Sequence, residues 1–191
     1  MDPFLQSAAL IALAEMGDKS QLAALAFATR FSARLTLAAI AAATLVVHLA
    51  SVVLGEVLGV TLPTFWIHLL GGLAFIGFGL WTLRGDSYDA DERPKLGGFG
   101  PFVSIAATFF LAELGDKTML ATITLGSQLN AFVPVWLGST VGMVAADAVA
   151  IAVGRMLGKR LPERAIRLSA AVIFLIFGGW EIAQTLAKAS L

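Results

Sequence analysis

The chain has 191 residues, of which 58% are hydrophobic and only 14% are charged, and its formal net charge is zero. Because about a quarter of the residues in a soluble domain are charged, this composition argues against a soluble protein, and the lack of a basic excess argues against a nucleic-acid partner. The absence of cysteine excludes disulfides and thiolate metal sites.

Proline, glycine and charge clusters divide the sequence into six apolar spans. These are Pro3 to Thr29, Arg34 to Gly59, Pro63 to Leu83, Pro101 to Ser127, Phe132 to Gly158 and Pro162 to Ala187. A helix of about 20 apolar residues crosses the ~30 Å hydrocarbon core of a bilayer. We therefore predict an all-α membrane protein with six transmembrane helices, and a polar linker over residues 85–100.

The two halves of the sequence repeat each other. "EMGDKSQLA" from Glu15 matches "ELGDKTMLA" from Glu113, and two further blocks match in the same order. Each half has three spans, an odd number, so the second half must enter the membrane from the opposite side. We therefore predict two inverted-topology three-helix repeats, residues 1–84 and 101–191. Transporters built in this way hold their substrate near the midplane, between the repeats.

Lys and Arg residues collect on one side of the predicted topology. Of the 13 in the chain, ten lie on that side, one on the other and two within spans. Because such residues mark cytoplasmic loops, we expect a multi-pass protein of the cell (inner) membrane. Both termini are expected outside and the central linker in the cytoplasm. The sequence is compatible with a homo-oligomer.

The first and fourth spans contain the same charged hexapeptide, "EMGDKS" and "ELGDKT". The charged residues of the two copies are Glu15, Asp18 and Lys19, and Glu113, Asp116 and Lys117. At about 1.5 Å per helical residue, each motif lies about 16–18 Å from the start of its span, close to mid-bilayer. Charges there cost at least about 2.5 kcal/mol each on insertion scales, so we expect them to be paired, hydrated or bound to a ligand.

Helical spacing predicts the geometry of each motif. Glu, Asp and Lys stand at i, i+3 and i+4, so they share one helix face, and Lys is placed to pair with Glu one turn earlier. Gly17 and Gly115 leave a bare patch for a neighbouring helix, or a point where the helix loosens and exposes carbonyl groups. Ser20 and Thr118 add hydroxyl groups, and Gln21 adds an amide in the first copy only.

The net charge of the two motifs together indicates what they could bind. Four carboxylates and two lysines leave two negative charges, which one divalent cation or two protons neutralise. A site balanced by either is what a metal/proton exchanger requires. Oxygen ligands suit hard ions such as Mn²⁺, Ca²⁺ and Mg²⁺. The purely structural alternative is that each motif is a buried Glu–Lys pair that holds helices together.

Other polar residues also lie within the spans. Aligning "HLASVVLG" with "DAVAIAVG" puts His48 opposite Asp147, both in mid-span. One interpretation is functional: the two residues relay protons or support the metal ligands from an outer shell. The other is structural: each residue faces water or forms a hydrogen bond with a neighbour. Glu56, His68 and Glu181 lie near span ends, where an interfacial position is expected.

The duplicated motif resembles the signature Glu-x-Gly-Asp-Lys/Arg-Ser/Thr of the MneA-type manganese exporters and their Golgi manganese/calcium relatives, and the resemblance covers nearly the whole chain. It implies a six-helix transporter that exchanges Mn²⁺ or Ca²⁺ for H⁺, and no enzyme. On this resemblance the metal ligands are Glu15, Asp18, Glu113 and Asp116. Lys19 and Lys117 then balance charge, and Ser20 and Thr118 supply supporting oxygens. Met119 departs from the family, which repeats the glutamine seen at Gln21.

Two alternatives fit parts of the sequence. Intramembrane aspartyl proteases use a Gly-x-Gly-Asp motif, but here the first Gly is Glu in both copies and Lys follows each Asp. An exporter of small cationic organic solutes could use the same fold, but such a substrate favours an apolar pocket over four carboxylates. We therefore predict a divalent-cation exporter, for Mn²⁺ first and Ca²⁺ second, that exchanges its cargo with H⁺ and has no tightly bound cofactor.

Overall fold

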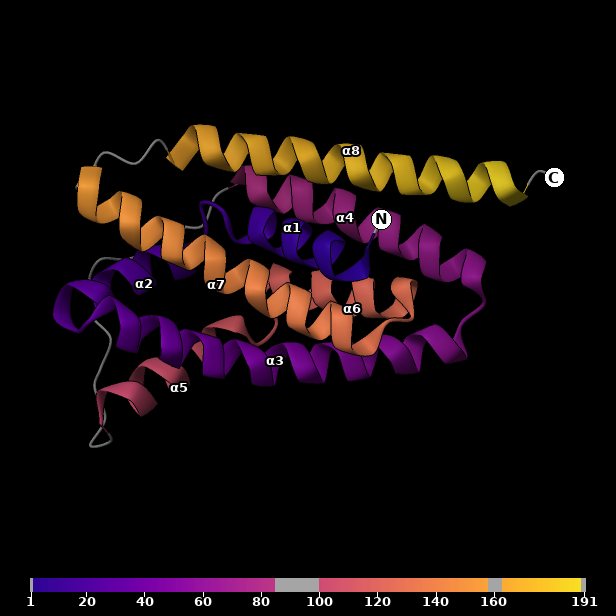
Figure 1. Cartoon of the computed structure of the whole chain (residues 1–191). Coiled ribbons are helices and arrows are strands. Elements are labelled where there is room, and N and C mark those ends of the chain that lie inside the picture. Colours follow the sequence, from indigo (N-terminus) through magenta and orange to yellow (C-terminus); the bar gives the residue numbers. More distant parts are fainter. Residues whose placement is uncertain (1, 85–99, 158–162, 190–191) are drawn as a thin grey trace.

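The structure, a computed structural model, describes residues 2–84, 100–157 and 163–189. Within these ranges all regular secondary structure is helical (Figure 1). The helices are α1 (Pro3–Glu15), α2 (Lys19–Arg30), α3 (Ala33–Thr61), α4 (Thr64–Arg84), α5 (Pro101–Glu113), α6 (Lys117–Leu129), α7 (Phe132–Leu157) and α8 (Glu163–Ala189). The predicted all-α class is confirmed. The predicted linker over residues 85–100 lies, except for Gly100, outside the described residues.

Each half of the chain places two short helices before two long ones. Among the described residues, four helices are long and apolar enough to cross a membrane, namely Ala33–Thr61, Thr64–Leu83, Phe132–Met156 and Leu168–Ala189. The protein is therefore a multi-pass α-helical membrane protein. The continuous helices predicted over Pro3 to Thr29 and Pro101 to Ser127 are wrong, because each is interrupted at its charged motif.

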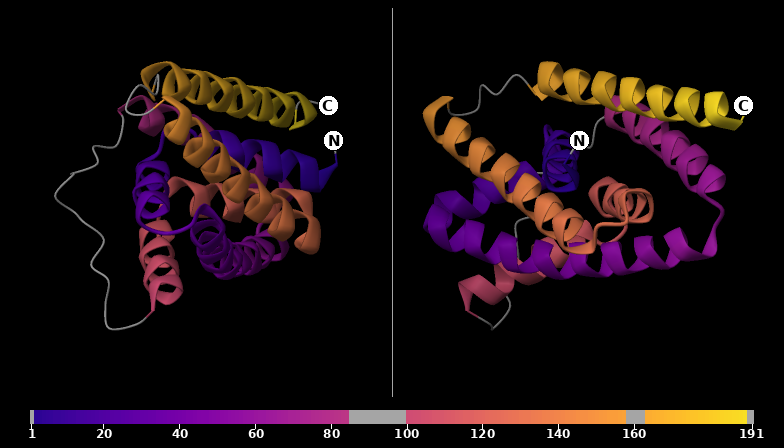
Figure 2. Two further views of the ribbon diagram at one scale, coloured as in Figure 1. Left: turned by 60° about the vertical axis from the view of Figure 1, so that its left-hand side comes forward. Right: turned by 45° about the vertical axis from the view of Figure 1, so that its right-hand side comes forward.

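The halves pack against each other reciprocally. α1 packs along α7 and its counterpart α5 packs on α3, while α6 packs on α3 and α2 on α7. The last helices of the two halves, α4 and α8, lie side by side (Figures 1 and 2). Each half therefore lays its broken pair of helices against the first long helix of the other half.

Two glycines on α7 set the position of α1. A Cβ atom at Gly138 would lie 2.4 Å from the carbonyl oxygen of Phe4, and one at Gly142 would lie 2.2 Å from that of Ala8. No side chain fits at such distances, so glycine lets the two helices meet backbone to backbone, as small residues do in membrane helix pairs. This contact fixes α1, and with it Glu15 at its C-terminal end.

Aromatic contacts join the two halves at two places. Phe75 and Phe78 of α4 meet Phe174 of α8, with ring centroids 6.1 and 6.3 Å away. Phe27 of α2 meets Phe109 of α5 with centroids 6.3 Å apart. All five rings are buried, and aromatic pairs of this kind add roughly 0.5–1.5 kcal/mol beyond their area. The apolar core therefore holds the halves together around the charged motifs.

Candidate functional site

Each charged motif forms the break between two half-helices. α1 ends at Glu15 and α2 begins at Lys19, and in the second half α5 ends at Glu113 and α6 begins at Lys117. The prediction that Glu, Asp and Lys share one helix face is therefore wrong. The other expectation, that the helix loosens at the motif glycine, describes the structure.

The glycine of each motif makes the break sterically accessible. Gly17 has φ 77° and Gly115 has φ 80°, in the left-handed region that residues with a Cβ rarely adopt. A break also leaves backbone amides unpaired, which is costly in an apolar environment. The Gly17 N–H donates to Gln21 Oε1 at 2.9 Å, and the Gly115 N–H donates to Met119 Sδ at 3.2 Å. The departure at Met119 thus keeps an acceptor at the equivalent position.

Gln21 has a second contact that Met119 cannot make. Its Nε2 donates to the Ala146 carbonyl oxygen of α7 at 3.2 Å. The first break is therefore tied to α7 directly beside Asp147, and the two copies of the motif differ in this respect. Sequence reasoning missed the bracing role, although the acceptor four residues after each glycine was a readable signal.

Asp18 and Asp116 are the N-cap residues of α2 and α6, but neither side chain caps its own helix. Asp18 Oδ1 instead accepts a hydrogen bond from Lys117 Nζ at 2.9 Å. The positive end of the α2 dipole also favours this carboxylate by roughly 0.3–1 kcal/mol. The expected pairing of Lys117 with Glu113 one turn earlier is wrong, because the lysine pairs with Asp18 in the other half of the chain. The side chain of Lys19 lies outside the described residues.

The hydroxyl residues of the motifs bind the glutamates. The Ser20 hydroxyl donates to Glu15 Oε1, and the Thr118 hydroxyl donates to Glu113 Oε2 at 2.6 Å. Ser20 Oγ also lies 3.2 Å from Asp18 Oδ2. Each hydroxyl therefore links the end of one half-helix to the start of the next and holds the glutamate side chain at the break.

The two motifs meet in one buried centre. Exposed fractions are 0% for Glu15, 3% for Asp18, 2% for Glu113, 7% for Asp116 and 3% for Lys117. Electrostatic interactions connect Glu15 with Glu113 and Asp18, and Glu113 with Asp116 and Asp18. Among the described residues, no three His, Asp or Glu side chains form a group of metal-ligand geometry. The centre is thus a network of carboxylates around Lys117.

Asp147 of α7 adjoins this centre. It is wholly buried and interacts electrostatically with Asp18, Glu15 and Glu113. Neither of its carboxylate oxygens has a hydrogen-bond partner among the described residues. A buried acid whose oxygens have no hydrogen-bond partner among the described residues, beside three other carboxylates, is unusual and calls for an explanation.

His48 of α3 is also wholly buried, and its ring nitrogens have no hydrogen-bond partner in the described part of the chain. The hydroxyl of Thr44, one turn earlier on α3, lies 3.4 Å from Met143 Sδ on α7, which is one turn before Asp147. His48 and Asp147 therefore each lie one turn past the contact between α3 and α7. The structure brings Asp147 to the charged centre and places His48 beside the helix crossing.

Comparison with known proteins identifies the family. The family described as "Divalent cation/proton antiporter GDT1" matches residues 3–90 and 101–189. The chain belongs to the GDT1 family. The resemblance read from the duplicated motif is thereby confirmed, and so is exchange of divalent cations for protons as the activity of the family. GDT1 proteins are transporters and not enzymes, so the intramembrane protease is set aside.

Several relatives match this GDT1 protein over most of its length. A "Putative manganese exporter" of Vibrio cholerae is 36% identical over 168 residues, which cover 87% of this chain and 83% of the relative. "GDT1-like protein 5" of Arabidopsis thaliana is 30% identical over 212 residues, covering 92% of each chain. "Protein PAM71, chloroplastic" of the same plant is 32% identical over 95% of this chain and 56% of its own. No solved structure matches the chain.

Proposed function

We propose that this antiporter carries Mn²⁺, with Ca²⁺ as its second cargo, and that Glu15, Asp18, Glu113 and Asp116 are the cation ligands. Carboxylate and hydroxyl oxygens are the donors that these ions prefer. Similarity to a relative named as a manganese exporter supports Mn²⁺ and the outward direction. The observation that carries the proposal is the ion pair from Lys117 to Asp18, which joins the two motifs in one buried centre.

Broken helices supply the rest of the site. The C-terminal ends of α1 and α5 reach the centre at Glu15 and Glu113, and such ends carry free carbonyl groups and partial negative charge. Discontinuous helices whose ends meet near the midplane are how many secondary transporters coordinate cations. Ser20, Thr118 and Gln21 support the site by holding the breaks in shape.

Lys117 serves as an internal counter-cation in this proposal. A divalent ion that binds Asp18 takes the place of the ammonium group as the neighbour of that carboxylate. Counting Asp147, five carboxylates stand against the two motif lysines, Lys19 and Lys117, which leaves three negative charges. A divalent cation neutralises two of them. We assign the third to a proton on Asp147, with His48 as the equivalent relay position on α3.

The proposal includes six membrane crossings in two inverted repeats. The broken pair α1–α2 contains 25 helical residues, 13 and 12, or about 37 Å at 1.5 Å per residue, enough for one crossing. The reciprocal packing of the halves and the one-sided distribution of Lys and Arg support this topology, with both termini outside the cell membrane. The α1–α6 and α5–α2 pairs are equivalent in the two halves, but α1 contacts α6 more extensively than α5 contacts α2. A conformational change in which the α1–α6 contact loosens and the α5–α2 contact tightens would give alternating access.

Transport by purified protein in liposomes tests the function, with Mn²⁺, Ca²⁺ and Mg²⁺ compared under an imposed pH gradient. We expect Mn²⁺ flux to grow with the gradient, and D18N or D116N to reduce it to the level of empty liposomes because each removes a charged ligand. E56Q makes the same kind of change outside the centre and should retain flux. Asp147→Asn should keep Mn²⁺ binding but lose the response to the gradient. Near-native Mn²⁺ flux in D18N or D116N would contradict the ligand assignment.

A further inference from the structure

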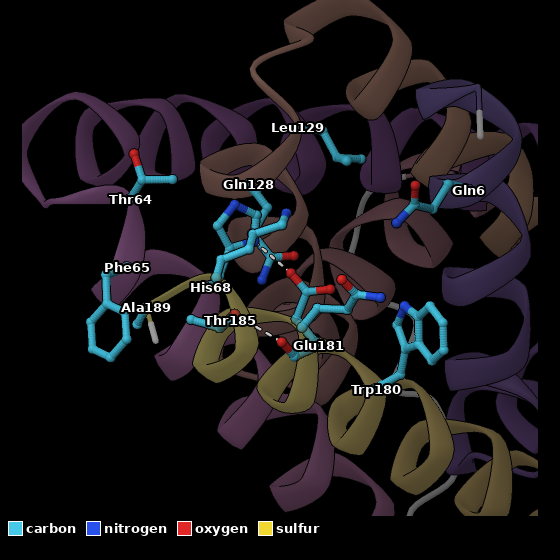
Figure 3. A pocket seen from close by; sticks show the side chains of 12 residues that line it. Gln6, Thr64, Phe65, His68, Gln128, Leu129, Trp180, Glu181, Thr185 and Ala189 are labelled. Atoms are coloured by element: carbon cyan, nitrogen blue, oxygen red, sulfur yellow. Dashed lines mark hydrogen bonds and ion pairs between the residues drawn. The ribbon is translucent and has the colours of Figure 1, made fainter. Parts of the chain in front are cut away.

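A cavity of about 550 Å³ lies at the end of the bundle where α1 and α4 begin and α6 and α8 end (Figure 3). Its polar lining comprises Gln6, Thr64, His68, Gln128, Glu181 and Gln184, together with Thr185 and Lys188. In the proposed topology this is the extracytoplasmic face. The cavity is separate from the charged centre, since none of the motif residues lines it.

His68 and Glu181 face each other across the wall of this cavity (Figure 3). His68 Nδ1 of α4 lies 2.5 Å from Glu181 Oε1 of α8, and the side chains are 34% and 18% exposed. An imidazole and a carboxylate at a water-accessible wall form a pair of donors for a transition-metal cation. An interfacial position was expected for His68 and Glu181 from the sequence, and in the structure both residues line this cavity.

A third donor, Gln128, is built into the same wall. Its Nε2 is buried and has no hydrogen-bond partner among the described residues. A Cβ atom at Gly71 would lie 2.0 Å from that nitrogen, so the glycine makes room for the amide. The same amide carries a carbonyl oxygen, which is the atom of a glutamine that can ligate Mn²⁺.

Helices α1 and α6 connect the cavity with the charged centre. α1 runs from Gln6 at the cavity to Glu15, a separation of nine residues or about 14 Å. α6 runs from Lys117 to Gln128, eleven residues or about 16 Å. The cavity therefore lies on one face of the protein, next to the charged centre along these two helices.

The pair belongs to that face alone. The repeat alignment that matches Ala74 with Ile173 puts Arg167 opposite His68 and Thr82 opposite Glu181. Neither substitute is a metal ligand of comparable strength, and a guanidinium repels cations. The equivalent positions, one in each half of the chain, therefore supply no comparable pair for the other face.

We propose that His68 and Glu181, with Gln128, form a second and weaker site for the transported divalent cation at the outer mouth of the transporter. The inference rests on the proposed function. A site with one imidazole and one carboxylate prefers Mn²⁺ over Mg²⁺ and Ca²⁺, which take oxygen ligands. Lys188 lines the same cavity and opposes a bound cation, so the site releases its ion readily, as an exit step requires.

Side-specific kinetics in liposomes test this site. H68Q and E181Q should each raise the KM for Mn²⁺ at least about tenfold when Mn²⁺ is supplied from the cavity face, as loss of a metal-site contact does. The KM from the opposite face should stay native, and E56Q should behave like the native protein from both faces. An unchanged KM from the cavity face, or an equal rise from both faces, would overturn the proposal. Absence of Mn²⁺ flux in the native protein would instead refute the proposed function.

A second measurement detects Mn²⁺ binding first in a protein that keeps both His68 and Glu181. Because the native chain has no cysteine, Gln184→Cys introduces a single thiol at the exposed wall of the cavity. We expect a membrane-impermeant maleimide to alkylate it from one face only, which also identifies the cavity face. Mn²⁺ should slow the alkylation and Mg²⁺ should not, and H68Q should abolish the protection. Alkylation at the same rate with and without Mn²⁺ would refute the site.

Discussion

At the scale of single residues, the ion pair between Lys117 and Asp18 is the contact on which the centre depends. Its two side chains are 4% and 1% exposed, so the pair is removed from both water and lipid. Breaking one partner of a buried pair costs about 3–5 kcal/mol, because the other charge is left without compensation. The pair therefore contributes to folding, and in the proposed function also to the charge balance of transport.

Lys117→Gln should lower the thermal stability of the protein and slow Mn²⁺ flux, while Mn²⁺ binds more tightly because the internal counter-cation is lost. The double variant D18N/K117Q leaves neither charge of the pair, so its stability should recover largely, but its transport should not. Thermal unfolding in detergent and Mn²⁺ titration measure the two effects. A double variant as unstable as Lys117→Gln alone would show that the pair is not the cause.

At the scale of helices, each motif divides one apolar span of the sequence into two half-helices. The left-handed glycine permits the turn, the side chain four residues later accepts its N–H, and the hydroxyl bridges to the glutamate. All these contacts fall within a few residues, so the break is encoded locally. In the proposed function, the break places two helix ends and a carboxylate at the charged centre.

Gly17→Ala should destabilise the protein by about 1–2 kcal/mol, the cost of a left-handed residue with a Cβ, and should reduce Mn²⁺ flux. Gly77→Ala is the matched control, because Gly77 lies within α4 and a Cβ there meets nothing within 4 Å. It should be neutral or slightly stabilising, since alanine favours a helix. Equal losses of stability in the two variants would contradict the role of the turn.

At the scale of the whole molecule, the two halves are equivalent in order and interlocked in space. Ser32 precedes α3 and Asn130 stands at the corresponding place before α7, and both are exposed. In inverted repeats such equivalent positions lie on opposite faces of the membrane. A direct topology measurement is therefore available in a chain without native cysteine.

Asn130→Cys should react with an impermeant maleimide in intact cells, whereas Ser32→Cys should react only after the membrane is permeabilised. The reason is the proposed orientation, with the loop before α3 in the cytoplasm and the loop before α7 outside. Labelling is read by gel shift, and a cysteine-free chain gives the background. Labelling of both variants from the same side would disprove the inverted repeat.

Much of the centre was predictable from the sequence, and the rest was not for physical reasons. Position along an apolar span predicted that both motifs are buried, and the duplication predicted that they act together. The break was only one of two expectations, because the spacing of Glu15, Asp18 and Lys19 also fits a continuous helix, and only the glycine conformation distinguishes the two. The partner of Lys117 was missed because it lies 99 residues away and depends on tertiary packing.

The reach of that ion pair also bears on how the chain is made. Asp18 leaves the ribosome 99 residues before Lys117, an interval of about 5–20 seconds at ordinary rates of synthesis. During that time the newly inserted first half has a buried acid whose partner has not yet been translated. The nascent chain must therefore tolerate a provisional arrangement, and the carboxylate acquires its final neighbour only when the second half arrives.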